Sequence, residues 1–145
     1  MTDAIRLHGV DYRPSREFAI RDLAMTVPRG AIYGFLGPNG SGKTTAIKLM
    51  LGMLRAENGT IDVLGHEVPR SVHLALARIG SVPERNHLWT YLTVGEVIAT
   101  HAAFYATWDS ARAEALRNQF ALRSTQTVSA LSKGEAGKLM MLLAL

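Results

Sequence analysis

A single glycine-rich segment constrains the fold of this chain more than any other feature. Its residues, Gly37-Pro38-Asn39-Gly40-Ser41-Gly42-Lys43-Thr44, match the pattern G-x-x-x-x-G-K-[ST]. The short apolar run 31–36 stands before it, and apolar residues recur at helical spacing from Ala46 to Leu54 behind it. This order predicts a strand, a phosphate-binding loop and a helix, and therefore an α/β fold.

Each part of this loop has a chemical use toward a nucleotide. Consecutive backbone N–H groups and a helix N-terminus present fixed positive poles to anionic phosphates. Gly40 and Gly42 suit positive φ and keep side chains out of the approach path. Lys43 can reach the outer phosphates, the Thr44 hydroxyl can ligate Mg²⁺, and Thr45 extends the N–H cradle. We expect ATP and Mg²⁺ here; the alternative is a glycine-rich turn that only joins strand to helix.

Further strands are predicted around this loop. The strand-like stretches 4–10 and 18–27 are joined by a turn-prone segment, which predicts an antiparallel sheet edge at the N-terminus. Asn58-Gly59 indicates a turn before the strand-like stretch 60–64. The residues 79–82 are a candidate for a short buried strand, which Pro83 would end.

The pattern becomes helical in the second half of the chain. Thr93 and Glu96 form a capping box for a helix expected to reach Ala106. Asp109 can cap a second helix over 111–120. Two consecutive helices predict an inserted helical subdomain. The last residues, 139–145, are apolar on every face, as in a helix cut in mid-run.

Composition narrows the possible partners and compartments. The net charge is +4, yet lysine and arginine are scattered along the chain, so we expect no nucleic-acid partner. Cysteine is absent, which excludes disulfides, thiolate metal sites and cysteine nucleophiles. No segment approaches the roughly 18 apolar residues of a membrane span, and the start lacks a signal-peptide core. We therefore expect a soluble, cytoplasmic protein.

The segment IYGFLGPNGSGKTTAIKLMLGML, read with the later LSKGE, resembles the nucleotide-binding subunit of ATP-binding-cassette (ABC) transporters. The resemblance covers essentially the whole chain. It implies a P-loop NTPase core with an N-terminal antiparallel β edge and an inserted helical subdomain, incomplete at the C-terminus. The expected division is a nucleotide-binding core over 1–86, a helical subdomain over 87–130, and the signature with its following helix over 131–145, with joints near Asn86 and Ser129.

Two family motifs are present in altered form. Where the family ends a strand with glutamine, this chain has Glu84, which implies a Mg²⁺ ligand of catalytic importance; the alternative is an exposed loop acid. Leu131-Ser132-Lys133-Gly134-Glu135 looks like the family signature, with Lys133 and Glu135 in place of glycine and glutamine. By resemblance, Ser132 and Gly134 face the γ-phosphate held by a partner subunit. On their own, Ser132 and Glu135 also read as a plain capping box.

The resemblance also implies partners. Tyr12 is the candidate for stacking on adenine, with ordinary strand packing as the alternative. The segment Asn86 to Leu92, with His87, Trp89 and Tyr91, falls where family members meet an integral membrane subunit, with core packing of its aromatic residues as the alternative. A second nucleotide-binding subunit, identical or related, would complete each site. The protein would then lie at the inner face of the cell membrane, and the wording SVPERNHLWTYLTVGE is more similar to exporters than to importers.

The mechanism implied by the family needs one group that this sequence does not display. Lys43 and the metal would stabilise charge on the γ-phosphate, but the family's catalytic glutamate follows a later strand motif beyond residue 145. We therefore expect this chain alone to bind MgATP and to hydrolyse it poorly. The alternatives are an ABC ATPase without a transport role and a degenerate cassette that only binds.

Overall fold

The computed structural model describes residues 3–85 and 87–145. The chain divides into two compact units, Met1–Arg78 and Ile79–Leu145. The first unit contains the phosphate loop, and the second contains the signature segment and the helices around it. Asn86, where the sequence predicts a joint and the start of a partner-binding segment, lies outside the described residues.

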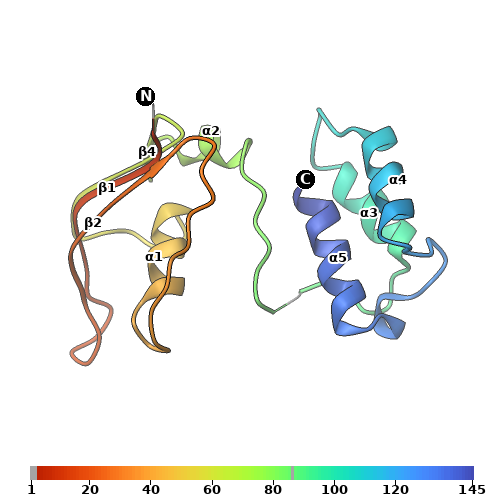
Figure 1. Cartoon of the computed structure of the whole chain (residues 1–145), viewed down its shortest axis with the longest axis horizontal. Coiled ribbons are helices and arrows are strands. Elements are labelled where there is room, and N and C mark those ends of the chain that lie inside the picture. The colour runs from red at the N-terminus through yellow and green to blue at the C-terminus, as the bar shows by residue number, and fades with distance from the viewer. Residues whose placement is uncertain (1–2, 86) are drawn as a thin grey trace. The chain divides into compact units, whose positions relative to one another are not determined.

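The first unit, in which Figure 1 labels β1, β2, β4, α1 and α2, is built on a four-stranded antiparallel sheet. The strand order is β2-β1-β3-β4. The central strand β1 pairs with β2 on one side and with β3 on the other, and Leu7 lies opposite both Met25 and Ile61. The predicted antiparallel edge is confirmed. The strands are β1 (Asp3–Tyr12), β2 (Ile20–Pro28), β3 (Asn58–Val63) and β4 (His66–Val68).

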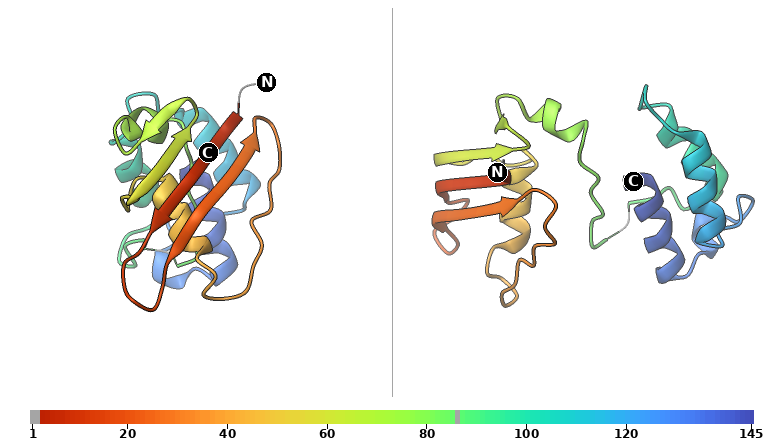
Figure 2. Two further views of the ribbon diagram at one scale, coloured as in Figure 1. Left: turned by 90° about the vertical axis from the view of Figure 1, so that its left-hand side faces the viewer. Right: turned by 45° about the horizontal axis from the view of Figure 1, so that its top comes forward.

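The helix α1 (Lys43–Met50) packs on one face of this sheet (Figure 2) and contacts β3. Its buried residues Ala46, Leu49 and Met50 recur at a spacing of three and one, so they form one apolar stripe. This packing sets the start of α1 at a defined place above the sheet. The short helix α2 (Val72–Leu76) contacts β4.

Two predicted strands are not formed, and the sequence prediction is wrong for both. The residues 31–36 and 79–82 have no ladder partner among the described residues. Ile32 is fully exposed and Leu36 is 90% exposed. A strand is stabilised by hydrogen bonds to a neighbouring strand, and an apolar run supplies only one half of such a pair. Apolarity therefore predicted burial without providing the partner that burial requires.

The predicted turn at Asn58-Gly59 is also not formed. Asn58-Gly59 does not form a turn ahead of a strand but opens β3 itself. Gly59 has φ of +84°, and its backbone lies so close to β1 that an added Cβ would stand 2.3 Å from the carbonyl oxygen of Gly9. Glycine is required here by a close approach between strands and by its left-handed conformation.

The second unit is helical. Its core is a buried cluster to which three helices and a loop contribute, made of Val94, Val97, Leu122, Val128 and Leu139. The last helix contacts both earlier ones. The first helix ends at Ala102, short of the expected Ala106. The elements are α3 (Val94–Ala102), α4 (Ser110–Gln119), the 3-10 helix η1 (Val128–Ala130) and α5 (Lys133–Ala144).

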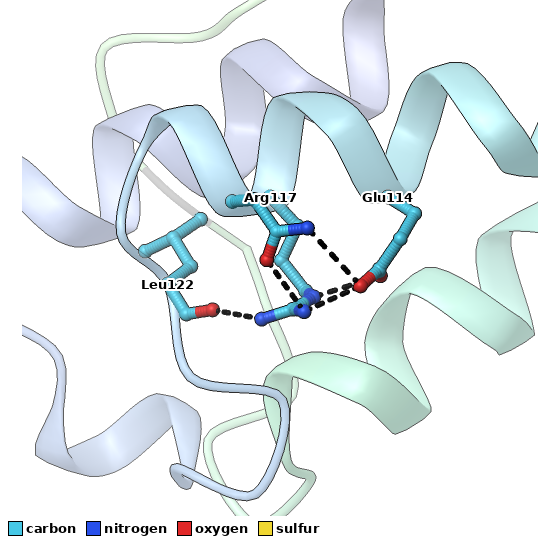
Figure 3. A network of polar contacts seen from close by, with 4 residues as sticks. Glu114, Arg117 and Leu122 are labelled. Carbon is cyan, nitrogen blue, oxygen red and sulfur yellow. Dashed lines mark hydrogen bonds and ion pairs between the residues drawn. The ribbon is translucent and has the colours of Figure 1, made fainter.

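Arg117 fixes the end of α4 (Figure 3). Its Nη1 donates to the carbonyl oxygen of Leu122 at 2.6 Å, which satisfies a backbone group just past the helix. Its Nε donates to Glu114 Oε2 at 2.9 Å. The hydrogen bonds from Arg117 lower the pKa of Glu114 below its ordinary value. Leu122 is thereby held at the position where its side chain enters the core.

Within the described residues, none of the helices has the length and apolar character needed to cross a membrane.

Candidate functional site: the phosphate loop

The glycine-rich loop has the backbone conformation that the sequence predicts. Gly40 has φ of +83° and Gly42 has φ of +91°, both in the left-handed region that glycine adopts without strain. Gly42 is also the N-cap of α1, and its carbonyl oxygen accepts the first helical hydrogen bond, from Ala46 N at 2.8 Å. No side chain caps this helix. The first amides of α1 are therefore available to an anion.

Lys43 folds back into the loop. Its Nζ donates to the carbonyl oxygens of Gly37 and Pro38, both at 2.7 Å, and lies 3.5 Å from Ser41 Oγ. The ammonium group is thus held by the loop backbone, beside the uncapped start of α1. A positive charge and a set of free amides share one small region, which is the electrostatic requirement for binding a polyphosphate.

The glycines serve different steric purposes. An added Cβ at Gly40 would meet no atom within 4 Å, so this part of the loop is open. An added Cβ at Gly42 would stand 3.1 Å from Phe18 Cζ and 3.4 Å from the side chain of Ile20. A side chain at position 42 would therefore run into the β1–β2 hairpin. Sequence reasoning missed Phe18, because nothing in its local pattern indicates which distant loop it touches.

The hydroxyl-bearing residues after the lysine have the expected setting. Thr44 is exposed in the first turn of α1, and Thr45 is half-buried behind it. An exposed hydroxyl next to the phosphate loop has the oxygen chemistry that Mg²⁺ prefers, so the residues present fit this metal. Tyr12 ends β1 and pairs with Ile20, and it is half-buried in the same unit as the loop.

The signature segment begins α5 with the predicted capping box, which is confirmed. Glu135 N donates to Ser132 Oγ at 3.2 Å, and Ser132 N donates to Glu135 Oε2 at 2.8 Å. The hydrogen bonds from the Ser132 side chain and backbone lower the pKa of Glu135 below its ordinary value. An added Cβ at Gly134 would meet no atom within 4 Å. The space around Gly134 is therefore open, while the Glu135 carboxylate lies at the start of α5 as part of the cap.

The remaining predicted residues belong to the second unit. Glu84 is exposed, and so are Trp89 and Tyr91 in the segment expected to meet a membrane subunit. Thr44 lies in the first unit and Glu84 in the second. A magnesium site that uses both residues stays a prediction, as do the roles of Ser132 and Gly134.

The family model and the similar proteins of known name all point to one family. Residues 20–145 match the ABC transporter family. The Nod factor export ATP-binding protein I of Ralstonia nicotianae is 33% identical over 104 residues, which cover 72% of this chain and 32% of the relative. ABC transporter A family member 10 of Arabidopsis thaliana is 35% identical over 130 residues, covering 90% of this chain and 14% of the relative.

A solved structure of an ATP binding subunit of an ABC transporter has the same fold, with a TM-score of 0.82 at 24% identity; the match covers 97% of this chain and 61% of that one. The chain spans about a third or less of the length of these two curated relatives. The family match over residues 20–145 and the 33% identity to the Ralstonia relative show that this chain belongs to the ABC transporter family.

Proposed function

We propose that this chain binds MgATP at residues 37–45 and acts as the nucleotide-binding part of an ABC transporter, coupling ATP binding and hydrolysis to transport. One observation carries the proposal: the Lys43 ammonium lies inside a loop that leads into a helix without a side-chain cap. Free amides and a fixed cation together suit a triphosphate better than either does alone.

The residues of the loop have separate tasks in this proposal. The amides at the start of α1 hold phosphate oxygens, and Lys43 neutralises charge on the outer phosphates. Thr44 and Glu84 are the proposed ligands of Mg²⁺. When bound, Mg²⁺ would supply positive charge that offsets the negative charge of the phosphates. Tyr12 is the proposed stacking partner of adenine.

The proposed partners follow from the family. Ser132 and Gly134 present the start of α5 to the nucleotide of a second nucleotide-binding subunit. The exposed residues Trp89 and Tyr91 are proposed to meet an integral membrane subunit at the cytoplasmic face. Export is the proposed direction, because the Ralstonia relative carries export in its name.

A binding-only cassette is the second candidate, and one observation favours it. The carboxylate of Glu135 already occupies the start of α5, where the proposed mechanism brings a partner's γ-phosphate. Two anions at one helix start repel each other. No residue among the 145 is assigned as the base that activates water, so we propose that this chain alone hydrolyses ATP poorly. Steady turnover by the wild-type chain that Lys43→Ala abolishes would contradict this.

Calorimetric titration tests the binding proposal. Wild-type protein, shown to be folded by circular dichroism, should give saturable heat with MgATP. Adenosine at the same concentrations should give none, since it lacks the phosphates that the loop recognises. Absence of heat with millimolar MgATP would overturn the proposal. A turnover assay with added membrane and nucleotide-binding partners then separates the transporter ATPase from the binding-only cassette.

A further inference from the structure

We propose that Phe18 is a positioning residue for the phosphate loop: its ring braces the backbone at Gly42 and holds the loop in its binding conformation. This inference rests on the proposed binding of a nucleotide. It concerns how the loop is supported, and it assigns Phe18 no contact with the nucleotide itself.

Phe18 is placed by the turn between β1 and β2. Its backbone N–H donates to Ser15 Oγ at 3.3 Å, and the N–H of Glu17 donates to the same oxygen at the same distance. Such a turn fixes the backbone just before β2 begins at Ile20. The ring is half-buried and comes from a hairpin whose strands are paired in the sheet. It is therefore attached to a rigid element.

The ring meets the loop at the residue where loop and helix join. The Cβ position of Gly42 is 3.1 Å from Phe18 Cζ, and Ile20 Cδ1 and Cγ1 both lie 3.4 Å from it. Two side chains of the hairpin thus close off one side of the Gly42 backbone. This glycine has φ of +91°, and its carbonyl starts the hydrogen bonding of α1. A shift of Gly42 would move the helix start.

Lys43 follows directly, so the brace also controls the lysine. The Lys43 Nζ reaches back to the carbonyl oxygens of Gly37 and Pro38, a geometry that depends on where α1 begins. At Gly40, by contrast, the Cβ position meets no atom within 4 Å. The loop is supported at one glycine and unobstructed at another, which lets a ligand enter without removing the support.

Binding of two ligands tests the positioning role. The Phe18→Ala variant should bind MgATP and magnesium tripolyphosphate about tenfold more weakly than wild type, because both need the same arrangement of amides and lysine. The Phe18→Leu variant retains an apolar side chain of similar reach and should bind both within about threefold of wild type. The matched control is Phe104→Ala, an exposed phenylalanine in the second unit, which should change neither dissociation constant.

The outcomes separate this inference from the proposed function. Unchanged dissociation constants in Phe18→Ala would overturn the brace while leaving the nucleotide site intact. Weaker MgATP binding with unchanged tripolyphosphate binding would also overturn it, because the ring would then contact the base. If wild type binds neither ligand, the proposed function fails and the inference fails with it. If Phe18→Ala does not fold, the variants Phe18→Leu and Phe18→Val replace it, and a Val variant that binds both ligands as tightly as the Leu variant refutes the brace.

Discussion

The helices α1 and α5 both begin with a lysine, but their N-terminal ends are capped differently. Each has lysine as its first residue, Lys43 in α1 and Lys133 in α5. The N-cap of α1 is Gly42, which gives no side-chain hydrogen bond, whereas Ser132 and Glu135 close the start of α5 with a capping box. The start of α1 has no side-chain cap, whereas the capping box of α5 satisfies the backbone N–H groups of Ser132 and Glu135.

The helix α3 has a capping box like that of α5 and offers a comparison with it; a helix start with such a box is called a closed start. Thr93 N donates to Glu96 Oε2 at 2.7 Å, and Glu96 N donates to Thr93 Oγ1 at 3.2 Å. These distances nearly repeat those of Ser132 and Glu135. The start of α5 thus has the geometry of an ordinary helix cap, so the proposed role in binding would rest on the open space at Gly134 and on the proposed partner subunit.

The largest expected effect separates the two lysines. The Lys43→Ala variant should bind MgATP roughly 10- to 150-fold more weakly, since a hydrogen bond to a charged group contributes about 1.5–3 kcal/mol. The Lys133→Ala variant should stay within about twofold of wild type. Calorimetry on both variants checks this, and equal loss of affinity in the two would remove the distinction between α1 and α5.

The second largest effect is a difference in stability between alanine variants of Gly42 and Gly134. The Gly42→Ala variant should lower the free energy of unfolding by about 1–3 kcal/mol, because alanine is strained at φ of +91° and its Cβ meets the Phe18 ring. The Gly134→Ala variant has open space and a helical position, so it should be neutral or up to about 1 kcal/mol more stable. Urea denaturation measures both. A stable Gly42→Ala protein would contradict the described loop.

A smaller effect compares the two closed starts. The Thr93→Ala and Ser132→Ala variants should each lose about 1 kcal/mol of unfolding free energy, the usual value of an N-cap side chain. Ser110→Ala, at an exposed first residue of α4, serves as the control. A clearly smaller loss of unfolding free energy in Ser132→Ala than in Thr93→Ala would indicate that Ser132 contributes little as a helix cap, as expected of a residue whose main role is to bind a ligand.

The smallest effect is a pH dependence that the capped starts of α3 and α5 share and the start of α1 lacks. Hydrogen bonds from the Thr93 backbone and side chain lower the pKa of Glu96, and those from Ser132 lower the pKa of Glu135, both from an ordinary 4.5. The stability that these groups contribute is therefore fully present above pH 4.5 and is lost as the pH falls through their lowered values.

Melting temperatures measured between roughly pH 3 and pH 6, the range in which carboxylates titrate, should fall as this stability is lost. A double variant, Glu96→Gln with Glu135→Gln, should have a flatter profile. The first turn of α1 carries no acidic residue, so it adds nothing to this slope. An unchanged profile in the double variant would show that other carboxylates dominate acid unfolding.

Most of the site could be predicted because its signals are local. The Gly42 N-cap, the Thr93–Glu96 box and the Ser132–Glu135 box each depend on residues within three positions of one another. The backbone angles and hydrogen bonds that they form need no distant partner. The same holds for the paired strands β1 and β2, which are joined by a short turn.

The features that sequence reasoning missed depend on a partner far along the chain. The run 31–36 is apolar enough for a strand but has no ladder among the described residues. The local pattern predicts Gly59 as a turn residue, whereas the close carbonyl oxygen of Gly9 on the neighbouring strand is what requires a glycine there. Phe18 looks like an ordinary strand-edge residue until the sheet brings it to Gly42.

The sequence by itself determined the phosphate loop, the lysine that enters it and the caps of the helices, because backbone conformation and short-range hydrogen bonding are set by neighbouring residues. Tertiary structure alone decided what supports the loop and which apolar runs become strands. Those outcomes depend on which surfaces meet in space, and a linear pattern does not specify them.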